Sequence, residues 1–110
     1  MISINGTTIR MTKGDTLRVL LALTDCEGYK YLPDEDDRIR FAMKKNYSDP
    51  EPLILKQIPT ESLLLTLNPE DTKNLEAPGT YVYDIEITYA NGDVDTFIDK
   101  AKLMLTQEVY

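Results

Sequence analysis

Residues 63–88 read LLLTLNPEDTKNLEAPGTYVYDIEIT, and this segment says more about the fold than any other. Every second residue from 63 to 67 is leucine, which predicts a strand with one buried face. Residues 69–74 are polar and begin with a proline, which predicts a short corner. Apolar side chains alternate again over residues 81–89, so we expect a strand, a corner and a second strand.

The corner has the arrangement that joins strands E and F in an immunoglobulin-like sandwich. Tyr81 lies two residues before Tyr83, which occupies the position of the second cysteine of antibody domains. A tyrosine at this point bonds to upstream backbone, and Asp71 and Gly79 are expected to shape the same corner. We therefore predict an all-β, immunoglobulin-like Greek-key β-sandwich of about seven strands, forming a single domain over residues 1–110.

Further strands are expected wherever apolar alternation recurs between turn signals. With the two above, they are placed at residues 2–4, 7–11, 16–24, 38–44, 53–57, 62–67, 81–90 and 94–105. Asn5–Gly6 and Asn91–Gly92 are predicted hairpin turns. The strands at 38–44 and 81–90 are expected to be neighbours with opposite charges on their outer faces. These charges belong to Arg38, Arg40, Lys44, Asp84 and Glu86.

Cys26 is the only cysteine, so no intrachain disulfide can form and apolar packing must connect the two sheets. A reducing compartment is therefore tolerated. The sequence begins without a basic start followed by an apolar run, and no apolar stretch approaches about 20 residues. We expect synthesis in the cytoplasm and no membrane partner.

The chain contains 19 acidic and 12 basic side chains, which gives a net charge of −7 at pH 7. Such a surface repels polyphosphate, so nucleic acid is not an expected partner. Histidine is absent, which removes the usual general base and most zinc ligand sets. No nucleophile–base pair or cofactor motif is visible, so an enzyme, a cofactor and a small-molecule ligand are not expected.

The densest charged segment consists of four consecutive acids: Asp34, Glu35, Asp36 and Asp37. Calcium would need several oxygens from a curved loop, but this spacing lacks the glycine and the distal glutamate of an EF-hand loop. A solvated acidic loop is the preferred interpretation, and a cation site stays the alternative. Cys26 has no activating base and is interpreted as an inert turn residue.

Exposed apolar and aromatic side chains are the candidates for contact with a partner. Leu20 and Leu64 are expected side by side on the outer face of one sheet. There they would mark an interface for other protein subunits or for a second copy of the chain. Further candidates are outward apolar residues and loop tyrosines: Ile54, Met104, Tyr29, Tyr31 and Tyr47.

Several short motifs resemble small immunoglobulin-like proteins of bacteriophage and prophage tails. The resemblance covers residues 10–105. It is carried by KGDT at 13–16, DCEG at 25–28, LNPEDT at 67–72 leading to Leu75, GTYVYDIE at 79–86 and NG at 91–92. The pattern is also similar to N-terminal modules of phage baseplate proteins that bind receptor-binding parts. The resemblance implies a non-catalytic component of a tail or baseplate, located in the virion. The alternative is a bacterial accessory domain that binds protein or carbohydrate through its loops.

Overall fold

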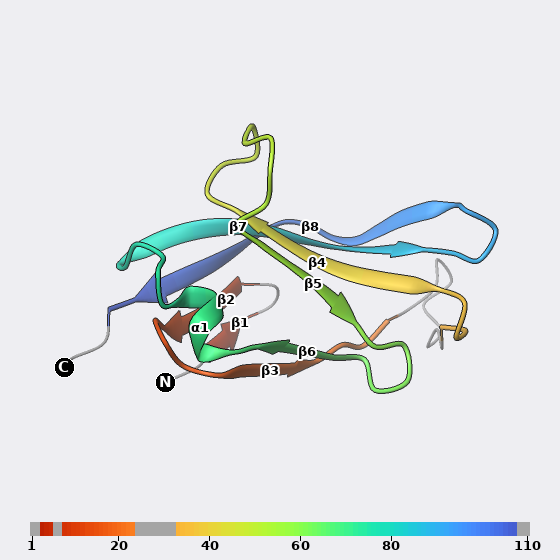
Figure 1. Cartoon of the computed structure of the whole chain (residues 1–110), viewed down its shortest axis with the longest axis horizontal. Helices are drawn as coiled ribbons and strands as arrows, with labels where there is room; N and C mark the ends of the chain where they lie inside the picture. The colour runs from red at the N-terminus through yellow and green to blue at the C-terminus, as the bar shows by residue number, and fades with distance from the viewer. Residues whose placement is uncertain (1–2, 6–7, 24–32, 108–110) are drawn as a thin grey trace.

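The computed structural model describes residues 3–5, 8–23 and 33–107 (Figure 1). Its elements are β1 (Ser3–Asn5), β2 (Thr8–Thr12), β3 (Leu17–Leu20), β4 (Arg38–Lys44), β5 (Ile54–Ile58), β6 (Leu64–Leu67), α1 (Pro69–Thr72), β7 (Gly79–Thr88) and β8 (Val94–Thr106). The prediction of an all-β fold is confirmed. None of the described residues form a helix with the length and apolar character needed to cross a membrane.

Two sheets face each other in the described part of the chain (Figure 1). The larger sheet has six strands in the order β1-β2-β8-β7-β4-β5, and the smaller sheet consists of β3 and β6. β2 and β8 run parallel, whereas β4 with β7, β7 with β8, and β3 with β6 are antiparallel. These last three pairings were predicted. They match strands C, F, G, B and E of an immunoglobulin-like sandwich, and so support that interpretation.

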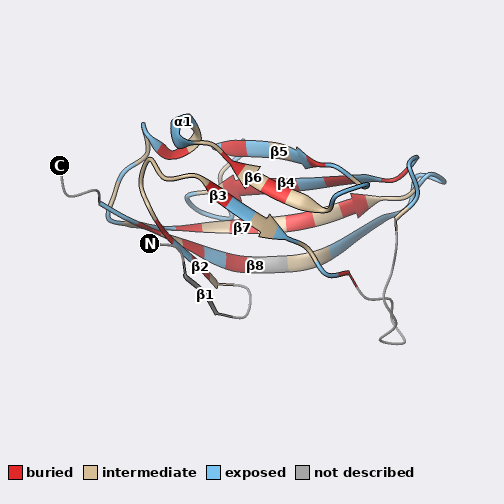
Figure 2. Ribbon diagram, turned by 90° about the horizontal axis from the view of Figure 1, so that it is seen from below, coloured by how far each residue is buried: buried red, intermediate tan, exposed pale blue. Residues whose placement is uncertain are grey.

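The core fills the space between the two sheets, and burial alternates along their strands (Figure 2). In β7 the buried side chains are those of Tyr81, Tyr83, Ile85 and Ile87, as their common parity predicted. The Tyr83 ring packs on Phe41, with the two ring centroids 5.2 Å apart. Both residues belong to the larger sheet, so this ring contact packs the core side of that sheet.

The expectation that Ile54 points outward is wrong. Ile54 is 6% exposed and lies opposite Met43, which is fully buried, in the antiparallel β4–β5 pair. Because directly opposed residues share a face of the sheet, Ile54 belongs to the core. Its neighbour Leu55 takes the outer face. Apolar residues occupy both parities of this segment, so alternation alone does not fix its orientation.

Unlike charges oppose each other at one position of the β4–β7 pair. Arg40 lies opposite Glu86, and its Nε donates a hydrogen bond of 3.0 Å to the carboxylate. This hydrogen bond raises the pKa of Arg40. The other predicted cations, Arg38 and Lys44, lie opposite uncharged residues. An exposed pair of this kind contributes at most about 1 kcal/mol, so it helps the register and does not create the fold.

The corner before β7 forms as predicted. The Tyr81 hydroxyl donates a hydrogen bond of 2.8 Å to the backbone carbonyl of Glu76. Gly79 allows this approach, because a Cβ at residue 79 would lie 2.9 Å from the Glu76 oxygen and 3.3 Å from the Tyr81 ring. Lys45 Nζ lies over the same ring, 4.7 Å from its centroid. These contacts therefore hold the first residues of β7 in position against the corner.

Asp71 holds the other side of the corner. Its carboxylate accepts a hydrogen bond of 2.7 Å from the Asn68 backbone at the start of α1. The same oxygen forms an ion pair of 3.0 Å with Lys56 of β5. β5 is the outer strand of the larger sheet, so this pair ties the sheet edge to the corner. An inward-pointing charge on an edge strand also discourages pairing with another sheet.

Replacing Tyr81 by phenylalanine removes the corner hydrogen bond and leaves the ring in place. We expect the free energy of unfolding to fall by about 1 kcal/mol, the usual loss for one such bond. Urea denaturation measures this change. Tyr47→Phe is the matched control, because Tyr47 is exposed and we expect its variant to keep wild-type stability. Equal stability of Tyr81→Phe and the wild type would show that the bond does not hold the corner.

Burial raises the pKa of Tyr83 to about 12. An unfolded tyrosine ionises near pH 10, so between about pH 10 and 12 the unfolded state releases a proton that the folded state keeps. Stability is therefore full below this window and falls as the pH rises through it, by up to about 3 kcal/mol from this residue. Urea midpoints measured along the pH series should fall less steeply for Tyr83→Phe. Parallel curves for the two proteins would contradict the assignment.

Candidate protein-interaction surface

Two leucines lie side by side on the outer face of the smaller sheet. Leu20 stands directly opposite Leu64 in the antiparallel β3–β6 pair, as predicted. Leu20 is 71% exposed, and Leu64 is half-buried. Leu17, three residues earlier in β3, is fully buried because an odd separation along a strand places side chains on opposite faces. The alternation that builds the core therefore also leaves Leu20 in solvent.

Arg18 and Thr66 complete this surface, which we call the β3–β6 face (Arg18, Leu20, Leu64 and Thr66). Arg18 lies opposite Thr66, two residues along each strand from the pair of Leu20 and Leu64, so all four side chains share one face. The four side chains include no carboxylate, thiol or imidazole, so the face is suited to binding rather than acid–base chemistry. Covering a leucine side chain contributes about 1.5–3 kcal/mol relative to leaving it exposed. A partner on this face would therefore gain affinity chiefly from apolar contact.

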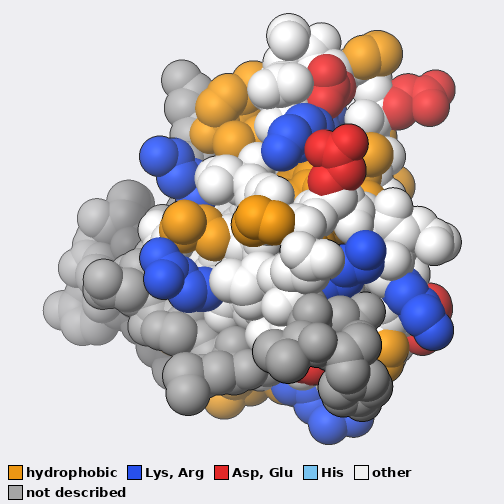
Figure 3. Space-filling view, turned by 90° about the vertical axis from the view of Figure 1, so that its left-hand side faces the viewer, with side chains coloured by type: hydrophobic (Ala, Val, Ile, Leu, Met, Phe, Trp, Pro, Cys, Tyr) orange, Lys and Arg blue, Asp and Glu red, His pale blue; other side chains and the backbone are white. Residues whose placement is uncertain are grey.

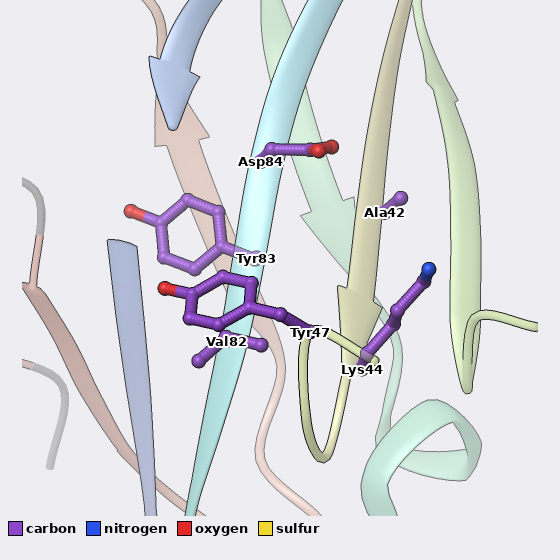
Figure 4. Close-up of a pocket in the computed structure, with 6 residues that line it drawn as sticks. All are labelled: Ala42, Lys44, Tyr47, Val82, Tyr83 and Asp84. Atoms are coloured by element: carbon purple, nitrogen blue, oxygen red, sulfur yellow. The ribbon is translucent and has the colours of Figure 1, made fainter. Parts of the chain in front are cut away.

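Tyr47 lies on the opposite side of the sandwich. It belongs to the loop between β4 and β5, which rises above the larger sheet and away from β3 and β6 (Figure 1). Its ring lies beside Val82 at a hollow of about 110 Å³ that Lys44 and Asp84 also line (Figure 4). This volume is below the roughly 300–1,000 Å³ typical of ligand pockets. Tyr47 is 52% exposed, which suits contact with a protein better than enclosure of a small molecule.

The structure therefore separates the predicted contact residues. Leu20 and Leu64 share one face, Tyr47 lies across the sandwich, and Ile54 is in the core. Met104 is half-buried in β8. Three other residues singled out from the sequence lie outside the described ranges: Cys26, Tyr29 and Tyr31.

The acidic run ends in a buried residue, so its interpretation as a solvated loop is wrong for Asp37. Asp37 is 5% exposed, whereas the three acids before it are exposed. Its carboxylate accepts hydrogen bonds from the backbone of Asp34 at 3.0 Å and of Ala90 at 3.1 Å. The Asp37 N–H donates to the Asp34 carbonyl at 3.0 Å and closes the turn. No local sequence pattern signals this role, because Ala90 lies 53 residues away.

The described residues provide no set of ligands for a cation at this run of acids. Within residues 3–5, 8–23 and 33–107, no three or more Asp, Glu, Cys or His side chains are grouped so that they could hold a metal ion. Both carboxylate oxygens of Asp37 accept backbone hydrogen bonds instead. The turn at residues 34–37, which we call the acidic turn, therefore holds the backbone just after β7 through the hydrogen bond from Ala90 to Asp37.

Leu55 is an exposed residue that the sequence analysis missed. It lines a hollow of about 400 Å³ on the outer face of the larger sheet, together with Arg38, Arg40 and Gln57. The sequence of β5 has no signal for it, because apolar residues occupy both parities there. Ile54 and Ile58 have the same parity and both are buried, which forces Leu55 outward.

The end of the molecule that carries α1 has a mixed surface. Figure 3 shows Lys and Arg side chains interspersed with Asp and Glu there, wherever the grey atoms leave the surface visible. The acidic turn lies at the other end, because it precedes β4 where that strand begins (Figure 1). Exposed acids are thus concentrated away from the end with mixed charges.

No protein-family model matches the sequence, and no curated protein matches it. The function is therefore inferred from the surfaces described above. Among the large apolar side chains that the structure describes, Leu20 is the most exposed.

Proposed function

We propose that this protein is a non-catalytic interaction module that binds other protein subunits, including copies of itself, through the β3–β6 face. One observation carries the proposal: Leu20 is highly exposed and stands directly beside Leu64. Single exposed leucines are common on folded proteins. Adjacent apolar side chains on a regular sheet face are typical of interaction sites instead.

The chemistry of the chain supports binding as its task. Histidine is absent from the sequence, so acid–base catalysis would depend on carboxylates. The β3–β6 face has no carboxylate, and the hollow beside Tyr47 is smaller than a typical substrate site. The energy available at the β3–β6 face comes from covering Leu20 and Leu64.

Replacing Leu20 and Leu64 by serine tests the face. Covering Leu20 contributes about 1.5–3 kcal/mol, and covering the half-buried Leu64 adds a smaller amount. The double variant should therefore raise the dissociation constant at least tenfold and shift the mass toward monomer. Light scattering over a concentration series measures the mass. Leu53→Ser is the matched control, because Leu53 is also exposed but lies in the β4–β5 loop. An unchanged oligomer in the double variant, or a strictly monomeric wild type that also binds no other subunit, would contradict the proposal.

We further propose that the assembly is a phage or prophage tail or baseplate. The motifs at residues 13–16, 67–72 and 79–86 support this assignment through their resemblance to tail proteins. Mass spectrometry of purified particles, from the source phage or from an induced lysogen, tests it. We expect the chain in fixed proportion to the tail proteins. Intact particles that lack the chain would contradict the tail assignment and leave the β3–β6 face to be tested separately.

A further inference from the structure

A second candidate surface lies across the sandwich from the β3–β6 face. It is the hollow of about 400 Å³ on the outer face of β4, β5 and β7, which we call the arginine hollow (Arg38, Arg40, Leu55, Gln57 and Thr88). Its volume is within the range of roughly 300–1,000 Å³ found for ligand sites. Leu55 is 58% exposed and provides an apolar wall, while the two arginines provide positive charge.

The two arginines differ in what they can offer a partner. Arg40 is already bonded to Glu86. Arg38 is exposed and forms no ion pair with the residues that the structure describes. A guanidinium presents its donors as a fork that matches both oxygens of a carboxylate. The arginine hollow is therefore suited to an acidic side chain that reaches Arg38.

An acidic turn lies next to the arginine hollow on the same chain. A hollow of about 260 Å³ is lined by Glu35 and Asp36 of that turn and shares Arg38 and Gln57 with the arginine hollow. The hydrogen bonds of Asp37 hold the turn in one shape. The backbone that carries the exposed carboxylates is thus ordered before binding, which lowers the entropy cost of the contact.

We propose that the arginine hollow binds the acidic turn of a second copy of this chain, and that the contact is reciprocal. When a socket and a projection lie side by side on one surface, a two-fold axis brings both pairs together at once. Arg38 of each copy then faces Glu35 and Asp36 of the other copy. A different acidic partner would fill the hollow and leave the turn of this chain unused.

Charge also favours this arrangement over a non-specific contact. The chain has a net charge of −7, so two copies repel each other at a distance. Local pairing of opposite charges offsets this repulsion. Arg38 beside the acidic turn supplies both signs on one surface, which makes that surface complementary to itself.

The proposal goes beyond the β3–β6 face, because the two surfaces lie on opposite sides of the sandwich. The test is therefore made in a Leu20→Ser/Leu64→Ser background, which removes association through the β3–β6 face. A negative result for one surface then does not change the interpretation of the other surface.

Charge reversal tests the reciprocal contact. Arg38→Glu and Glu35→Lys each place like charges across it, and each is expected to weaken the dimer at least tenfold in sedimentation velocity. An equimolar mixture of the two variants should recover the dimer, because both contacts of the mixed pair join opposite charges. Lys73→Glu and Glu51→Lys change the net charge equally at other exposed residues and should leave the dissociation constant within about twofold. Circular dichroism confirms that each variant is folded.

Three results would overturn the proposal. One is a background protein that stays monomeric up to about millimolar concentration, the weak end of measurable association. Another is a mixture of the two variants that behaves like either variant alone. The third is a monomeric chain that binds a synthetic peptide of alternating glutamate and leucine at Arg38, which would assign the hollow to a different acidic partner.

Discussion

The register of β7 is the constraint on which the rest of the structure depends. β7 lies between β4 and β8, and its buried side chains form the middle of the core. A slip by one residue would turn every one of them to solvent. Two side-chain bonds prevent this slip from opposite ends. Tyr81 bonds to Glu76 where the strand begins, and Asp37 bonds to Ala90 just after it ends. These two bonds therefore support the register that the apolar alternation of the strand sets.

The same alignment decides what each surface offers. The alignment of β4 is set by its pairing with β7, and the alignment of β5 by its pairing with β4. Ile54 is therefore directed inward and Leu55 outward. Lys56 then points inward from the outer strand and meets Asp71 of the corner. The β5 edge of the larger sheet is therefore charged, which discourages pairing of another strand at that edge. The outer faces of the two sheets carry Leu20 on one side and Leu55 on the other.

Local patterns predicted the parts of the structure that depend on neighbours in sequence. Alternation placed the strands, and the spacing around Tyr81 predicted its corner bond. The pairing of Leu20 with Leu64 followed once the strand order was assumed. The errors arose where a distant contact decides. Ile54 has apolar neighbours of both parities, so only its alignment with Met43 fixes its direction. Asp37 resembles the exposed acids before it, and only the backbone of Ala90 distinguishes it.

Two faces on opposite sides of one chain have a geometric consequence for any assembly. A two-fold contact on a single face closes a dimer and stops growth. Two different two-fold contacts give each copy two neighbours. If their axes cross, the assembly closes as a small dihedral oligomer, and if the axes are parallel it continues as an open row. Both faces combine arginine with leucine, Arg18 with Leu20 on one and Arg38 with Leu55 on the other. The acidic turn beside the arginine hollow is therefore the feature that would distinguish two such contacts.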